Sequence, residues 1–256
     1  MNMKPMQAMD KQQGLSLIEL MVALLLSTLL ILGVSQIYID NKRNYAFQQG
    51  QSDNIENARY ALLLLEEELF RTGYRTRPDE AYDQIFRAEV SGSCSFSTGE
   101  VINYDAEEQR LCLRYQPNLE QVTSCTGAAI PGASQPYSEN VDPIIVSLEI
   151  SNDTLLCNGV ALIPNLVGIE LRFGVSDDST RETQEFKSAP DAGDFIRSVK
   201  YAALLKSRSE NLADSAGNNA YSTWHAKWRD DDNAEAPDRA LYLAVENTVA
   251  LRNLSK

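Results

Sequence analysis

The sequence predicts an α+β fold, in which one long N-terminal α-helix packs on antiparallel β-sheets joined by long loops. Two observations predict it. A helix-compatible pattern without proline runs between Pro5 and Pro78, far longer than an ordinary globular helix. Beyond Gly73, short β-like runs follow one another between turn residues without helical patterns between them, which favours antiparallel pairing.

The first part of the helix is long and apolar enough to cross a membrane. The segment 20–39 carries no charge, and about 20 such residues span the hydrocarbon core. A secretory signal peptide has a shorter apolar region and a small-residue cleavage site, which Ser35-Gln36-Ile37-Tyr38 does not offer. Before the run, Lys4 and Lys11 oppose only Asp10. Because positive residues stay cytoplasmic, everything after residue 39 is expected outside the cytoplasm.

The second part of the helix carries an apolar stripe suited to packing on a folded domain. The stripe consists of Ile55, Leu62, Leu65 and Leu69. Glu67 and Arg71 are spaced for an ion pair within the helix, and Gly73 is placed to end it. Gly33 and Gly50 are the positions where the helix could bend or unwind.

The exported part should be rich in strands. The best strand candidates are 99–104, 110–115, 143–150, 166–175, 195–205 and 240–251. In the fourth of them, Val167, Ile169, Leu171 and Phe173 alternate with Gly168, Glu170 and Arg172, which predicts one buried and one solvent-facing side. The polar stretches 117–142 and 207–238 lack periodicity and are expected to be long, mobile surface loops.

Composition excludes several kinds of function. The 256 residues include 36 acidic residues against 23 lysines and arginines, for a net charge of −13. Sequence-independent nucleic-acid binding takes most of its affinity from Lys and Arg, so no direct nucleic-acid partner is expected. The sequence shows no nucleophile motif, phosphate-binding loop or metal motif. No enzymatic activity, cofactor or metal is therefore expected.

Three polar or aromatic groups are candidate sites. His225 is the single histidine, and an ordinary packed or surface role is expected for it. The run Asp230-Asp231-Asp232-Asn233 lacks the glycine and distal glutamate of a calcium loop, so we interpret it as a solvated charge run. Trp224 and Trp228 lie four residues apart, where local packing is more common than an exposed docking stripe.

Glu19 is the one carboxylate in the apolar run. A charged side chain at the centre of a membrane helix costs about 2.5–3.5 kcal/mol on insertion scales. No Lys or Arg of the same helix lies within reach of Glu19. The charge therefore needs a partner from elsewhere.

The segment around Glu19 resembles a known signal. Gly14 followed by Leu15-Ser16-Leu17-Ile18-Glu19-Leu20-Met21-Val22-Ala23 is similar to the class III signal of type IV prepilins. The resemblance implies cleavage after Gly14 by an inner-membrane prepilin peptidase and N-methylation of Leu15. It also implies that Glu19 pairs with the terminal amine of a neighbouring subunit and sets the axial register. One departure is Leu15 itself, because the family usually has phenylalanine there.

Later blocks resemble PilW-type minor pilins. They are SCTG (124–127), LLCN (155–158), LVGIELRFG (166–174), IRSVKYAALL (196–205) and TVALRN (248–253). The tryptophan that the family has shortly before the fourth block is absent, and Phe195 stands nearby. The resemblance implies a structural protein that joins other minor pilins and the major pilin in the inner membrane. Such proteins prime pilus assembly, lie near the fibre tip, support a PilY-type adhesin, and serve twitching motility, adhesion and DNA uptake indirectly.

Two alternatives stay open. A GspJ-type pseudopilin of a type II secretion system shares the signal and the expected architecture. A membrane-anchored periplasmic enzyme or ligand-binding module would not require the glycine-ended leader. In the pilin reading the chain divides into a cleaved basic leader (1–14), a transmembrane polymerisation segment (15–39), an amphipathic helix (40–73) and a periplasmic β-rich domain (74–256). The protein would cross the inner membrane once and then enter the fibre.

The four cysteines permit three pairings, and an oxidising compartment favours disulfides. The resemblance favours Cys125–Cys157, because both positions match the family's paired motif. Cys94–Cys112 is then the second pair.

Overall fold

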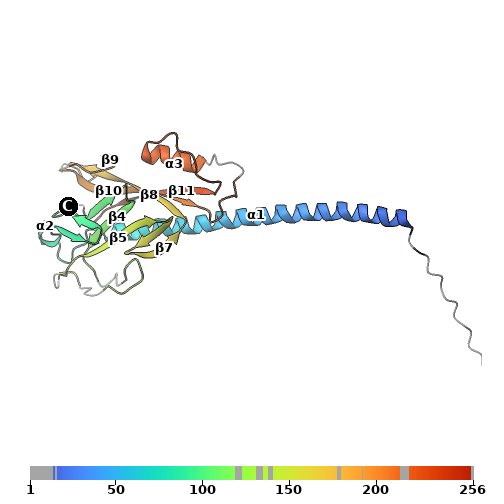
Figure 1. Cartoon of the computed structure of the whole chain (residues 1–256). Coiled ribbons are helices and arrows are strands. Elements are labelled where there is room, and N and C mark those ends of the chain that lie inside the picture. The colour runs from blue at the N-terminus through green and yellow to red at the C-terminus, as the bar shows by residue number, and fades with distance from the viewer. Residues whose placement is uncertain are drawn as a thin grey trace, which may run out of the picture. The chain divides into compact units, whose positions relative to one another are not determined.

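The computed structural model describes residues 14, 16–118, 123–130, 135–137, 141–177, 180–191, 193–213 and 219–254. Internal contacts divide the chain into two units, Met1–Phe47 and Gln48–Lys256. In the second unit, the end of a long helix packs on two antiparallel sheets, which confirms the predicted α+β fold class (Figure 1).

Helix α1 (Leu17–Arg71) continues without interruption through Gly33 and Gly50, where a bend was expected. Gly50 is buried, and a Cβ atom there would lie 2.8 Å from Leu212 Cδ1 and 3.2 Å from Ser207 Cβ. Its missing side chain lets the segment that follows β10 (Phe195–Lys206) approach the helix closely. Gly50 is therefore a position of close packing and not a point where the helix bends or unwinds.

The first sheet has five antiparallel strands in the order β3-β4-β5-β6-β7. They are β3 (Ile102–Asp105), β4 (Arg110–Tyr115), β5 (Ile144–Ser151), β6 (Thr154–Cys157) and β7 (Val160–Pro164). Neither β6 nor β7 was among the strands expected from the sequence. The sequence does contain turn dipeptides that separate these strands, Asn152-Asp153 and Asn158-Gly159. All four residues take positive φ in two-residue hairpin turns.

The second sheet has four antiparallel strands in the order β11-β10-β8-β9. They are β8 (Leu166–Ser176), β9 (Glu185–Lys187), β10 (Phe195–Lys206) and β11 (Tyr242–Ala250). The long central strands β8 and β10 match two of the predicted strands closely. A small hairpin, β1 (Glu89–Ser91) with β2 (Cys94–Phe96), and the short helix α2 (Tyr82–Ile85) complete the region before the first sheet.

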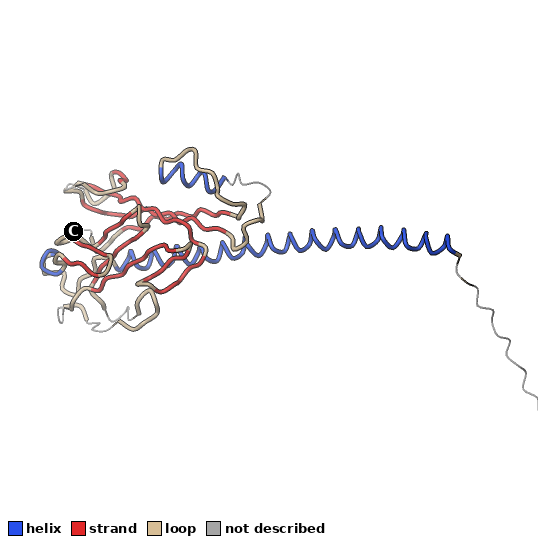
Figure 2. The backbone as a smooth tube through the Cα atoms, in the orientation of Figure 1, coloured by secondary structure: helices blue, strands red, loops and turns tan. Residues whose placement is uncertain are grey.

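The last part of α1 lies against the strands in Figure 2, and its buried stripe joins one core with both sheets. That stripe includes Ala58, Ala61, Leu65 and Leu69, each at most 3% exposed. The predicted stripe was wrong at Ile55, which is 53% exposed, and only partly right at Leu62. Small alanines face the sheets here, because they permit close approach of the helix.

Polar side chains of α1 fix the helix to both sheets. Asn54 donates to the Leu241 carbonyl at 2.7 Å, next to β11. Asn57 donates to the carbonyl of Pro164, the last residue of β7, at 3.3 Å. From the second sheet, the Tyr201 hydroxyl donates to the Leu62 carbonyl at 3.0 Å. These bonds connect the helix to both sheets and orient its buried stripe.

Part of the predicted loop 207–238 is wrong, because it contains helix α3 (Asn219–Arg229). The helix covers the outer side of the second sheet, so Gly168 and Glu170 are buried rather than facing solvent. A Cβ atom at Gly168 would lie 2.7 Å from the Trp224 ring. Of the loop 117–142, positions 119–122, 131–134 and 138–140 lie outside the described residues.

Candidate functional site

The N-terminal segment presents the expected processing position at the start of α1. Gly14 is exposed and lies outside any helix or strand, with no atom within 4 Å of a Cβ built on it. Leu15, the expected methylated residue, lies outside the described residues. Ser16 accepts a bond from Leu20 N at 3.1 Å, and α1 begins at the next residue. Gly14 is thus sterically open to a peptidase.

Glu19 lies in the first turn of α1 and is exposed. No ion pair of Glu19 occurs among the residues that the structure describes. The amides at a helix N-terminus favour a carboxylate by about 0.3–1 kcal/mol. Glu19 lies near the start of the apolar helix rather than at its centre, where a charge would cost about 2.5–3.5 kcal/mol. The described residues offer this carboxylate no counter-charge beyond the helix N-terminus.

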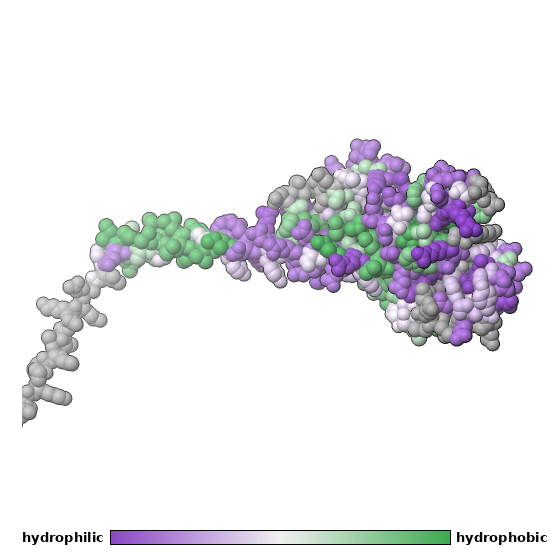
Figure 3. Space-filling model, turned by 180° about the vertical axis from the view of Figure 1, so that it is seen from behind, coloured by the Kyte–Doolittle hydropathy of each residue, from purple (hydrophilic) through white to green (hydrophobic). Residues whose placement is uncertain are grey.

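The helix around Glu19 is suited to an apolar solvent. The helix has an apolar window of 18 residues, none of it buried by the protein. In Figure 3 this part of the helix forms a continuous hydrophobic surface. Two of its hydroxyl side chains bond within the helix: Ser27 donates to the Ala23 carbonyl at 2.6 Å, and Thr28 to the Leu25 carbonyl at 2.8 Å. This segment meets the length and polarity requirements of a membrane-spanning helix.

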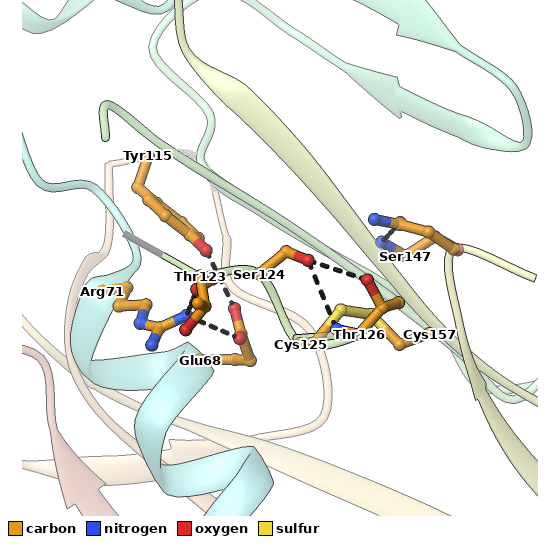
Figure 4. Close-up of a disulfide and its surroundings, with 10 residues drawn as sticks. Glu68, Arg71, Tyr115, Thr123, Ser124, Cys125, Thr126, Ser147 and Cys157 are labelled. Atoms are coloured by element: carbon orange, nitrogen blue, oxygen red, sulfur yellow. Dashed lines mark hydrogen bonds and ion pairs between the residues drawn. A yellow bond between two sulfur atoms is a disulfide. The ribbon is translucent and has the colours of Figure 1, made fainter. Parts of the chain in front are cut away.

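The other end of α1 carries a buried polar cluster, shown in Figure 4. Arg71 is 5% exposed and pairs with Glu67, as predicted, and with Glu68 at 3.1 Å. The Tyr115 hydroxyl of β4 donates to the second oxygen of Glu68 at 3.2 Å. Arg71 also donates to the Thr123 carbonyl at 3.1 Å. Burial raises the pKa of Glu68, against the opposing pull of Arg71.

The disulfides anchor the segments around this cluster. The structure joins Cys125 to Cys157, with Cα atoms 6.4 Å apart, and Cys94 to Cys112 at 5.7 Å. These are the two pairings expected from the sequence. Cys125 lies two residues after Thr123, so its bond to β6 holds the segment that supplies the acceptor for Arg71. The disulfide that holds this segment was expected from the sequence, but the bond between the segment and Arg71 of α1 was not.

The end of α1 is capped from the C-terminal part of the chain. Gly73 has φ +72°, as expected for the residue that terminates a helix. The Asn253 side chain donates to the carbonyls of Phe70 at 2.8 Å and Thr72 at 3.2 Å. A helix leaves its last carbonyls without intrahelical donors, so Asn253 satisfies two of them. This asparagine closes the last of the blocks that resemble PilW-type proteins.

The aromatic residues of α3 are packing residues. Trp224 is 2% exposed and Trp228 is 8% exposed, so the exposed docking stripe considered for them is wrong. Both belong to a small apolar cluster between α3 and the second sheet. His225 stacks on Tyr221 with ring centroids 4.3 Å apart, and burial lowers its pKa. These contacts agree with the ordinary packed role expected of the single histidine.

No metal-binding group emerges from the part of the chain that the structure describes. Its His, Cys, Asp and Glu side chains nowhere form a group of three or more that could hold an ion.

Comparison with known proteins supports the interpretation of the N-terminal segment. Residues 9–35 match the prokaryotic N-terminal methylation motif, and this range includes Gly14, Leu15 and Glu19. No curated protein matches the chain in sequence. Among solved structures, a type IV-like pilin from Thermus thermophilus is similar at 9% identity and a TM-score of 0.42, covering 79% of this chain and 98% of that chain. The chain thus carries a prokaryotic N-terminal methylation motif at the start of an apolar helix that is long enough to cross a membrane.

Proposed function

We propose that this protein is a minor pilin of a type IV pilus, with a structural rather than a catalytic role. Its signal is cleaved after Gly14, Leu15 becomes the N-methylated first residue, and the apolar helix enters the fibre from the inner membrane. The exported domain stands in the periplasm until assembly. Its partners are the prepilin peptidase, other minor pilins and the major pilin.

Glu19 is the observation that carries the proposal. It is a charge within an apolar helix, and the described part of the chain offers it no ion pair. An opposite charge that meets the carboxylate in the membrane lowers the free-energy cost of placing it there. Cleavage after Gly14 creates an amine on every processed subunit. Pairing of Glu19 with the amine of a neighbouring subunit neutralises both charges and fixes the axial step between helices.

We further propose that the protein lies near the tip of the fibre. This position is supported by the PilW-type blocks, which contain Cys125, Cys157 and Asn253. These three residues hold or cap the end of α1. In this role the protein joins other minor pilins to prime polymerisation and supports a PilY-type adhesin. Twitching motility, adhesion and DNA uptake then depend on it indirectly.

The second candidate is a GspJ-type pseudopilin of a type II secretion system. The methylation motif favours it as much as it favours a pilus subunit. The two candidates differ in phenotype: deletion of a minor pilin gene abolishes surface fibres, whereas deletion of a pseudopilin gene stops the secretion of exoproteins.

Glu19→Ala tests the assembly role in the full-length chain. We expect normal membrane insertion and processing, because the change makes the helix more apolar, but at least a tenfold loss from sheared fibres, the equivalent of about 1.4 kcal/mol. Ser27→Ala is the matched control, since it removes a polar group that bonds only within the helix. Quantitative immunoblotting of the fibre and membrane fractions measures the ratio of each variant in fibres to the same variant in the membrane. Equal incorporation of the two variants would refute the pairing role of Glu19.

Processing is tested separately by intact mass. In cells with an active prepilin peptidase, the mature chain should begin at Leu15 and carry one added methyl group. Gly14→Val should keep the leader, because the Cβ branch fills the open space at the cleavage position. A wild-type chain that keeps residues 1–14 in the presence of the peptidase would contradict the proposal.

A further inference from the structure

A cavity of 530 Å³ lies beside the part of β8 that no second strand covers, near β9 and the end of α3 (Figure 1). Strand β8 pairs with β10 along its length, whereas β9 pairs only with the segment Phe173–Val175 on the other side. The cavity volume falls within the range of about 300–1,000 Å³ that is usual for small-molecule sites. The cavity is therefore large enough to hold a ligand.

Two backbone groups of Leu171 point into this cavity. The Ile169 amide donates to the Gln109 side chain at 2.9 Å, and the Ile169 carbonyl accepts from the Tyr104 hydroxyl at 2.7 Å. These bonds show that Ile169 directs its backbone groups away from β10. Phe173 does the same, because it pairs with β9. Backbone groups alternate between the two edges of a strand, so Leu171 presents its N–H and C=O to the same side as these neighbours.

These groups of Leu171 have no bonding partner in the part of the chain that the structure describes. Leu171 is only 3% exposed and its side chain belongs to the main core, so its backbone is what lines the cavity. A nearly buried N–H or C=O without a partner costs a free energy comparable to a lost hydrogen bond. A molecule that both donates and accepts hydrogen bonds at this point would satisfy both groups.

Most of the charged side chains around the cavity are already paired. Glu170 is 8% exposed and lies 2.7 Å from Arg229. The Lys187 ammonium lies 2.8–3.0 Å from three carboxylates. Arg172 and Asp230 also line the cavity, and neither has an ion pair among the described residues. These two open charges are of opposite sign, so they favour neither an anion nor a cation.

The cavity also offers a fixed donor and an exposed aromatic ring. One nitrogen of Arg172 donates to the Lys227 carbonyl at 2.6 Å, and the guanidinium lies 5.3 Å from the centre of the Trp228 ring. These contacts hold the guanidinium while its other N–H groups remain available. The Phe186 side chain is 43% exposed and lies over Gly174, where a Cβ atom would be 3.0 Å from the ring.

We propose that this cavity binds a neutral sugar ring of a glycan. A sugar hydroxyl both donates and accepts, as the two backbone groups of Leu171 require. Further hydroxyls accept from Arg172 and donate to Asp230, while the apolar face of the ring packs on Phe186. Apolar contact combined with a few placed polar groups is the usual composition of a small-molecule site. The proposal does not rest on the pilin assignment.

Saturation-transfer NMR tests the site on the purified full-length chain in an amine-oxide detergent, which carries no sugar. The probes are the methyl glycosides of glucose, galactose and N-acetylglucosamine. We expect at least one to bind with a Kd of about 1 mM. Amide exchange at Leu171 should then slow about fivefold at saturation, because the sugar covers this N–H.

Three results would overturn the proposal. They are failure of all three glycosides to bind, binding that leaves the exchange of Leu171 unchanged, and displacement of the bound glycoside by glycine. The last result would make a free amino acid, which carries both charges, the occupant.

Phe186→Ala removes the exposed ring, and Val160→Ala is the matched control, because Val160 is an exposed apolar residue of another edge strand. The first variant should lose affinity for the glycoside about fivefold, and the control should keep it. Both should keep the wild-type unfolding temperature. Equal affinity of Phe186→Ala and the wild type would refute the site. Binding is measured without fibres, so failure of the Glu19 experiment leaves this test intact.

Discussion

At the residue scale, buried polar groups of this protein act by joining separate segments. Tyr201 of β10 is fully buried, and its hydroxyl bonds the Leu62 carbonyl within α1. Burial raises the pKa of Tyr201 to about 12, with Glu66 adding to the effect and Asn247 opposing it. The hydroxyl must therefore stay protonated for the helix to keep its place on the sheet.

Tyr201 predicts a loss of stability in alkali. The unfolded chain releases this proton near the ordinary value of 10, and the folded chain near 12. The unfolded state thus binds fewer protons between these values, so the free energy of unfolding falls as pH rises through them, by about 2–3 kcal/mol. Burial also raises the pKa of Tyr82 and Tyr115 to about 12, so Tyr201→Phe should make the fall smaller by this amount and not abolish it. The lost hydrogen bond should cost about 1 kcal/mol at neutral pH.

Urea unfolding of the full-length chain at a series of pH values measures this difference. Tyr60→Phe, on the exposed side of α1, is the control and should follow the wild type. If the free energy of unfolding of Tyr201→Phe and of the wild type fell in parallel between pH 10 and 12, Tyr201 would not contribute to the loss of stability in alkali.

At the element scale, the second part of α1 packs on the sheets through one face. Leu69 is fully buried between the sheets, whereas Ile55 is 53% exposed. Leu69→Ala should lower the free energy of unfolding by about 2–5 kcal/mol, because it leaves a cavity in the main core. Ile55→Ala should change it by less than about 0.5 kcal/mol. Chemical denaturation of both variants decides whether the helix buries the face seen here, since similar losses would mean that it does not.

Helix α3 is the element that sequence reasoning missed. Its apolar residues Trp224 and Trp228 are separated by polar ones in a stretch rich in Asp and Asn, so no apolar stripe of ordinary length identifies it. The two tryptophans were the available signal, and their packing on Gly168 and Ala202 explains why a short helix is stable there. Its presence also converts the expected solvent-facing side of β8 into a buried one.

At the scale of the whole molecule, the two disulfides should contribute unequally. Serine at both Cys125 and Cys157 should cost about 4 kcal/mol by loop entropy and further stability through the freed Thr123, which accepts a bond from Arg71. Serine at both Cys94 and Cys112, which close a shorter loop, should cost about 3 kcal/mol. Urea midpoints of the full-length variants give the comparison. A larger loss for the Cys94–Cys112 pair would argue against coupling between the Cys125 segment and the helix end.

The sequence by itself determined the features that depend on local pattern. The membrane-length helix, Gly14, Glu19, the helix end at Gly73 and the long strands β8 and β10 follow from runs, spacing and single residues with special backbone freedom. The tertiary structure alone decided that Ala58 and Ala61 rather than Ile55 are buried, how Gly50 packs, and that Arg71 bonds the disulfide-held segment. It also placed β11 at one end of the second sheet. These depend on contacts between residues far apart in the chain, whose energies no local pattern contains.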